Sequence, residues 1–244
     1  GISGGISVPL AKAYGWQLSL FIWIIPAATA LLLWLPNRNT VLAVKAKRAS
    51  KGGSIAKDSM TWLISLYIGV QSLLFIVLSP SLQQFYRAGD LISPSLAIII
   101  PFICCWASPV PWLFLSWPKK VKNQSKLGVG LGIIYIIGLA TMLLSDGVPA
   151  LIIAIICCGF CSGACISFSM ALFDLHTKNA ADTSTLSGLA QSVGYLLAAI
   201  GPIALGKIYD VCHSWTMPLV LLLILALVLT VLGYLAGREK IINN

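Results

Sequence analysis

Apolar residues run through the chain in blocks of about twenty, and short polar segments separate the blocks. A helix needs about 20 apolar residues to cross the hydrocarbon core of a bilayer. The pattern therefore predicts a transmembrane helix bundle with seven complete spans and one partial span at the start of the chain. The expected spans are residues 1–11 (partial), 16–35, 59–78, 96–117, 127–144, 149–172, 184–206 and 217–235.

Prolines and polar clusters mark the expected ends of these spans. We expect the helix that starts near residue 184 to break at Gly201-Pro202, because proline removes a backbone hydrogen bond. Residues 80–94, which contain Arg87 and Asp90, are expected to form a turn region. Residues 174–182 read as a polar loop that contains His176, and a loop histidine usually just solvates.

Polar side chains are unevenly distributed among the spans. Spans 59–78, 149–172 and 184–206 carry Gln, Tyr and Ser, whereas spans 16–35, 127–144 and 217–235 are almost entirely apolar. Polar groups inside a bilayer face protein or water. We therefore expect the three polar spans to surround a cavity and the apolar spans to face lipid.

The strongest candidate site lies on two of the polar spans. Ser187, Gln191 and Tyr195 fall four residues apart and share one helix face, and Tyr67 and Gln71 share another. The residues predicted to contact a solute are Gln71, Gln191, Tyr195 and Tyr67. A purely structural interpretation stays open, because a polar side chain in a membrane often bonds only a neighbouring helix, for about 0.6 kcal/mol on average.

Small residues predict where helices approach each other closely. Gly194, Ala198 and Gly201 form a small-residue face beside the polar face of the same helix. A Gly128-x-x-x-Gly132 motif does the same in the apolar span 127–144. We expect both faces to pack directly against neighbouring helices.

The composition is typical of a membrane protein, with 58% hydrophobic and 9% charged residues. The net charge is +9, and thirteen of the sixteen Lys and Arg residues lie in segments 36–58, 117–126 and 173–183 and after residue 237. These segments fall on one side in the predicted topology, as positive-inside orientation requires. The charge therefore indicates a cytoplasmic C-terminus and not a nucleic-acid partner.

The sequence shows no arrangement of residues typical of an enzyme. It has no metalloprotease, phosphate-binding or nucleophile-elbow motif in context. Cys157, Cys161 and Cys165 share a helix face, and a soft-metal site there is conceivable. We favour the alternative that they are small buried apolar residues, and we expect no cofactor and no metal.

Three blocks of sequence resemble the cyanate permease family of the major facilitator superfamily. They are LSGLAQSVGYLLAAIGP at 186–202, followed by Gly206, Asp210 and Ser214-Trp215; WLISLYIGVQSLLF at 62–75; and 9–36, which contains Gly15-Trp16 and ends in Trp34-Leu35-Pro36. The resemblance implies a transporter of twelve helices in two six-helix halves. The family pattern usually has an arginine where this chain has His176.

The resemblance also implies how the chain is divided. Residues 1–35 would hold the end of helix 5 and helix 6, 36–58 the central cytoplasmic loop, and 59–244 the C-terminal six-helix half. The expected function is secondary active transport of a small solute, such as a cyanate-like anion or a small drug, by alternating access in the inner or plasma membrane. The missing N-terminal half would then be a partner. The alternative is a polytopic membrane scaffold or subunit that does not transport.

Overall fold

A computed structural model describes residues 7, 9–11, 13–35, 55–88, 124–145 and 147–238. The chain forms two compact units, Gly1–Ala49 and Ser50–Asn244. The described residues contain helices and no strand, and six segments are long and apolar enough to cross a membrane. These segments are Trp16–Leu33, Ser59–Leu78, Gln124–Leu144, Val148–His176, Ala180–Cys212 and Thr216–Ala236. The predicted span 96–117 and residues 36–54 of the predicted loop lie outside the described residues.

The first unit contains the predicted span 16–35 as two helices, α2 (Trp16–Phe21) and α3 (Ile24–Trp34). The helix is interrupted by a turn at residues 22–23. Pro26 accounts for this interruption, because it has no N–H to donate to the carbonyl four residues earlier. Ser7 is tied to this region, since it accepts hydrogen bonds from the Ser19 hydroxyl and the Trp23 indole, both at 2.9 Å.

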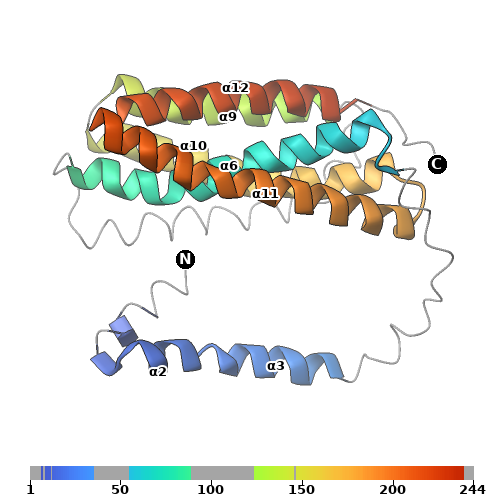
Figure 1. Ribbon diagram of the computed structural model, residues 1–244, viewed down its shortest axis with the longest axis horizontal. Helices are drawn as coiled ribbons and strands as arrows, with labels where there is room; N and C mark the ends of the chain where they lie inside the picture. The colour runs from blue at the N-terminus through green and yellow to red at the C-terminus, as the bar shows by residue number, and fades with distance from the viewer. Residues whose placement is uncertain are drawn as a thin grey trace. The chain divides into compact units, whose positions relative to one another are not determined.

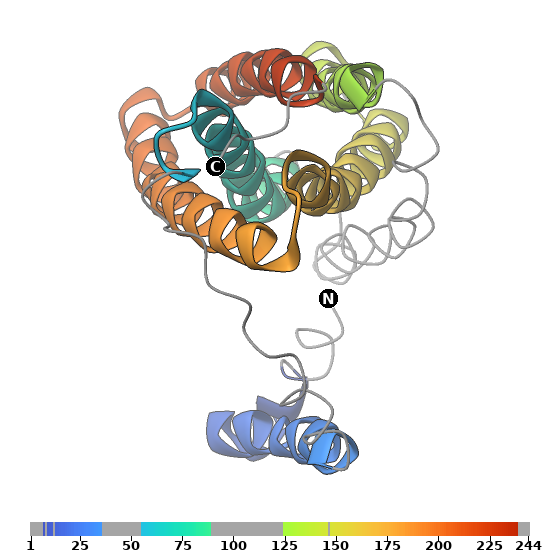
Figure 2. The same ribbon diagram turned by 90° about the vertical axis from the view of Figure 1, so that its right-hand side faces the viewer.

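The second unit is a bundle of long helices that run back and forth along one axis (Figures 1 and 2). Its described helices are α6 (Ser59–Ala88), α9 (Gln124–Leu144), α10 (Val148–His176), α11 (Ala180–Cys212) and α12 (Thr216–Ala236). Helix α6 packs mainly against α11 and also contacts α12 and α10. Helices α9 and α12 pack against each other, and α9 also packs against α10. The chain is therefore a multi-pass membrane protein.

Two helices continue through prolines at which the sequence predicts an end. Helix α6 runs past Pro80 to Ala88, and α11 runs past Pro202 to Cys212. Both predicted breaks are therefore wrong. A proline frees only one backbone carbonyl, and neighbouring helices or local adjustments can satisfy it. Continuing the helix keeps the remaining backbone groups hydrogen-bonded, which the bilayer strongly favours.

The connection between α10 and α11 is also shorter than predicted. Helix α10 ends at His176 and α11 starts at Ala180, so residues 174–182 are not a long polar loop. Asn179 caps α11: its side-chain oxygen accepts from the Asp182 N–H at 2.9 Å, and its amide donates to the Asp182 carboxylate at 2.8 Å. This reciprocal cap satisfies two polar groups at the helix start. His176 is buried, which contradicts the expectation that it is a solvated loop residue.

Glycines bring α6 and α11 close together, as the small-residue face predicts. A Cβ atom on Gly194 would lie 2.8 Å from the Ile68 Cγ2 atom and 3.1 Å from the Gly69 backbone nitrogen. A Cβ atom on Gly201 would lie 2.8 Å from Leu73 Cγ. Both contacts are too short for any larger residue. The two backbones therefore meet directly at Gly69 and Gly194.

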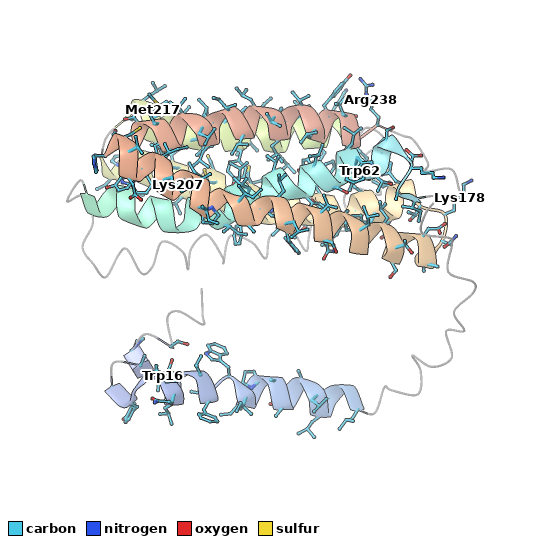
Figure 3. The ribbon with its side chains drawn as sticks, in the orientation of Figure 1. Trp16, Trp62, Lys178, Lys207, Met217 and Arg238 are labelled. Atoms are coloured by element: carbon cyan, nitrogen blue, oxygen red, sulfur yellow. The ribbon has the colours of Figure 1, made fainter. Side chains whose placement is uncertain are left out.

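The two ends of the bundle hold different parts of the chain. Figure 3 places Lys178 and Arg238 at one end and Lys207 and Met217 at the other. The connection between α10 and α11 and the end of α12 thus lie at the same end. Helices α9, α10, α11 and α12 alternate in direction along the bundle axis, and α6 runs in the same direction as α11 (Figure 1).

Helices α9 and α12 make the second close contact, at Gly128 and Gly233. A Cβ atom on Gly128 would lie 2.5 Å from the Gly233 carbonyl oxygen, whereas a Cβ atom on Gly130 would have nothing within 4 Å. The Gly128 motif therefore packs directly against a neighbouring helix, as predicted.

We expect Gly128→Ala to destabilise the protein by about 1–3 kcal/mol, because the added methyl group meets backbone atoms that cannot move aside. Gly130→Ala is the matched control on the same helix. Both substitutions raise helix propensity by about 1 kcal/mol, so only packing separates them. Thermal unfolding of the complete protein in detergent should show a lower Tm for Gly128→Ala and an equal or higher Tm for Gly130→Ala. Equal Tm values for the two variants would contradict the contact.

Candidate solute pocket

A pocket of about 220 Å³ lies between α6, α10 and α11. Its polar lining residues are Gln71, Ser72, Ser169, Gln191 and Tyr195, and its apolar lining residues are Ile68, Phe75, Ile76, Ile166 and Met170. No charged residue is among them. The three helices that line the pocket are the three whose spans carry the polar faces in the sequence, whereas α9 and α12 contribute no lining residue.

Gln191 is oriented by its own helix. Its side-chain nitrogen donates a hydrogen bond to the Ser187 hydroxyl at 2.9 Å, one turn earlier on α11. This bond confirms that the two residues share a face, as their spacing predicts. It uses one of the two N–H groups of the amide, and the carbonyl oxygen retains its acceptor capacity. Gln191 is therefore oriented by its own helix, and this bond leaves one N–H group and the carbonyl oxygen of the amide unoccupied.

The α6 side of the pocket provides two polar groups. Gln71 is 2% exposed and Ser72 is 7% exposed, and both line the pocket. In the part of the chain that the structure describes, neither side chain makes a hydrogen bond. A primary amide carries two donors and one acceptor oxygen with two lone pairs. The Gln71 amide and the Ser72 hydroxyl thus bring donors and acceptors to the lining of the pocket.

Ser169 provides the corresponding group on α10. Its hydroxyl donates to the Cys165 carbonyl at 2.8 Å, so its own proton is used within the helix and its oxygen can still accept. Ser162 and Ser167 also donate to carbonyls of α10, but they do not line the pocket. Sequence reasoning gave no site role to Ser72 or Ser169. Serine is common on buried membrane helices, and its spacing alone does not reveal which one reaches a pocket.

The pocket has exposed lining residues on all three helices. Tyr195 of α11 is 54% exposed, Ile76 of α6 is 41% exposed and Met170 of α10 is 37% exposed. Gln71 is buried among the same lining residues.

Tyr67, the fourth residue predicted to bind solute, does not line the pocket. It is fully buried one turn before Gln71, and its ring meets the Phe168 ring edge-on with centroids 5.6 Å apart. Among the described residues its hydroxyl has no hydrogen-bond partner. Tyr67 thus lies behind the pocket wall, where α6 packs against α10.

The cysteines of α10 lie in the same packed region. Cys161 donates to the Leu131 carbonyl of α9 at 3.2 Å, and the Tyr135 hydroxyl lies 3.1 Å from the Ser162 hydroxyl. Within the described part of the chain, no group of three or more His, Cys, Asp or Glu residues could hold a metal ion. Of the three cysteines on the shared face, Cys161 thus bonds to α9, and the expectation that the face holds no metal stays a prediction.

Comparison with known proteins identifies relatives along nearly the whole chain. The sequence profile of the Major Facilitator Superfamily matches residues 1–202. The "Uncharacterized transporter YycB" of Bacillus subtilis is 32% identical over 243 residues, which is 99% of this chain and 60% of the relative. The "2-nitroimidazole transporter" of Escherichia coli is 31% identical over 247 residues, which is 98% of this chain and 61% of the relative. The chain thus spans about three fifths of the length of these relatives.

We expect water to reach the pocket. Gln191→Cys should react with a charged, membrane-impermeant methanethiosulfonate reagent, because position 191 lines the open pocket. Ala190→Cys is the matched control, since Ala190 is fully buried in the neighbouring position on α11. The chain has native cysteines, so the measured quantity is the increase in labelling over the parent protein. If position 191 reacts no faster than position 190, the pocket is closed to water.

Proposed function

We propose that this chain, which belongs to the Major Facilitator Superfamily, forms part of a transporter that carries a small solute across a membrane by alternating access. The observation that supports the proposal best is the pocket between α6, α10 and α11. It combines uncharged hydrogen-bonding groups with apolar walls, as small-molecule sites usually do. We assign solute contact to Gln71, Gln191 and Tyr195, and we add Ser72 and Ser169.

The pocket favours a small, flat solute. Its volume is about 220 Å³. Pockets that bind drug-sized ligands are usually larger, with volumes of about 300–1,000 Å³. Phe75, Ile166 and Met170 supply apolar surface for a ring, and two amides supply both donors and acceptors for ring substituents. A nitroimidazole has these properties, and one relative is named as a 2-nitroimidazole transporter. We therefore propose a small polar aromatic ring as the substrate class.

A cyanate-like anion is the second candidate, because the sequence resembles the cyanate permease family. The pocket gives it less support. None of the lining residues in the described ranges carries a positive charge, and a desolvated anion requires either a cation or several donors. Gln71 and Gln191 would have to supply those donors together with groups outside this chain. The assignment to the cyanate permease family stays a prediction.

We further propose the division of the chain that the resemblance implies. Residues 59–244 would form a C-terminal six-helix half, 1–35 would belong to the end of the other half, and 36–58 would connect them on the cytoplasmic side. The protein would lie in the inner or plasma membrane of the cell. The end of the bundle that holds Lys178 and Arg238 would then face the cytoplasm. The other half would supply the opposite wall of the pocket.

A non-transporting scaffold is the alternative function. A scaffold would use its polar side chains to join helices, so its buried amides and hydroxyls would be paired. The arrangement of the polar side chains speaks against this alternative, because Gln71, Ser72, Ser169, Gln191 and Tyr195 from three helices line one pocket. A solute site accounts for this arrangement more simply than a scaffold does.

We expect Gln191→Ala in the complete protein to lower 2-nitroimidazole uptake by about two- to tenfold, the loss of one hydrogen bond. Ser192→Ala is the control, because the Ser192 hydroxyl donates to the Gly188 carbonyl at 2.7 Å and lies outside the pocket. Uptake into vesicles is measured together with the amount of protein in the membrane. If Gln191→Ala takes up 2-nitroimidazole as fast as the wild type at normal abundance, Gln191 does not contribute to the site. No uptake above empty vesicles by the wild type would reject this substrate.

A further inference from the structure

His176 connects the ends of two helices. It is the last residue of α10 and is 2% exposed. Its Nδ1 atom lies 2.8 Å from the Leu172 carbonyl oxygen, and its Nε2 atom lies 3.2 Å from the Arg238 carbonyl oxygen. Arg238 follows the end of α12 by two residues. The ring therefore reaches from the last turn of α10 to the end of α12.

Both partners of the ring are hydrogen-bond acceptors. A backbone carbonyl has no proton to donate, so each contact requires an N–H group on the ring. Neutral imidazole has one N–H group, and only the doubly protonated imidazolium has two. In the neutral form, one of the two contacts would bring a ring lone pair against a carbonyl oxygen, which is repulsive.

The two carbonyls belong to different helix ends. Leu172 lies in the last turn of α10, and Arg238 lies just past the last turn of α12. Two helix ends therefore meet at one histidine, a residue whose number of N–H groups changes on protonation.

We propose that His176, with the carbonyls of Leu172 and Arg238, forms a proton-dependent bridge that holds the ends of α10 and α12 together. With both nitrogens protonated, the bridge makes both bonds. When the Nε2 proton is lost, only the Nδ1–H bond to the Leu172 carbonyl within α10 remains, and the end of α10 is freed from the end of α12. The proposal does not depend on which solute is carried.

Other charged groups lie at the same end of the bundle, on every helix there. They are Lys57 and Asp58 before α6, Lys126 on α9, Asp174 and Lys178 at the end of α10, Asp182 on α11 and Arg238 after α12. The Arg238 guanidinium lies over the Tyr234 ring, 4.8 Å from its centroid, and the Asp182 carboxylate accepts from Asn179. In the part of the chain that the structure describes, the His176 ring is hydrogen-bonded only to the two carbonyls. A protonation change at His176 therefore acts directly on these two bonds.

The bridge connects a pocket helix to a helix outside the pocket. Met170 and Ser169 of α10 line the pocket, and α12 contributes no lining residue. His176 follows Met170 by six positions, which corresponds to about 9 Å along a helix at 1.5 Å per residue. Release of the bridge would therefore allow the end of α10 to move relative to α12, less than two turns from the solute.

Hydrogen–deuterium exchange of the complete protein in lipid nanodiscs tests the bridge without any substrate. The peptides of interest cover residues 172–178 and 233–238, and residues 207–217 at the opposite end serve as the internal reference. Exchange is followed at pH 5.5 and pH 8 and corrected for the intrinsic rate. We expect protection of the 172–178 and 233–238 peptides to fall about tenfold at pH 8, since a hydrogen bond to a charged group is lost, with no such change in the reference peptide.

Three variants make the test specific. His176→Gln should show, at both pH values, the lower protection that the wild type shows at pH 8. His176→Arg keeps a permanent positive charge, so its protection should not fall at pH 8. His213→Asn is the control at the opposite end, because His213 is exposed and asparagine tolerates its φ of 47°. It should behave as the wild type does.

The proposal is overturned if the wild type shows no greater pH dependence at 172–178 and 233–238 than at the reference peptide. It is also overturned if His176→Gln keeps the wild-type pH dependence. If His176→Gln does not fold, His176→Arg decides alone: loss of the pH dependence supports the bridge, and its retention overturns it. None of these results depends on uptake of 2-nitroimidazole, so failure of the transport proposal would be recognised separately.

Discussion

The direct contact between α6 and α11 at Gly69 and Gly194 determines where the pocket can form. Lipid provides no hydrophobic force that drives helices together, so close packing of small residues must do this. Gly69 lies two residues before Gln71, and Gly194 lies between Gln191 and Tyr195. The backbones meet at the same level as the polar side chains. A larger residue at either glycine would separate the helices, and the amides of α6 and α11 would no longer line the same pocket.

Much of this fold can be predicted from the sequence, because the bilayer restricts it strongly. Span length and the separation of polar from apolar helices follow directly from the energy of burying polar groups in lipid. The ends of the helices do not follow. Proline predicts a break in water, yet α11 continues through Pro202 because the bilayer penalises an open backbone more than it penalises one lost hydrogen bond. The position of His176 depends on the cap formed by Asn179 and Asp182, which determines the length of the connection.

The pocket shows the limit of helical periodicity as evidence for a site. Tyr67 and Gln71 are four residues apart on one face, yet only Gln71 lines the pocket. Tyr67 instead packs edge-on against Phe168 of α10. The difference comes from a neighbour that is about a hundred residues away in the sequence. Periodicity identifies the face that turns inward, and only tertiary packing decides which turn of that face contacts a cavity.

The open side of the pocket places a requirement on what lies against it. Tyr195 of α11, Ile76 of α6 and Ile166 of α10 line the pocket and are exposed by 54%, 41% and 40%. If lipid chains filled the pocket, the polar groups that line it could not bond to the occupant, and each group left unsatisfied would cost about 1–3 kcal/mol. Water or further protein therefore suits the pocket better than lipid does, whereas the isoleucines at its rim are compatible with either. A second helical wall would both shield the apolar rim and retain the water that the amides require, as a solute pathway needs.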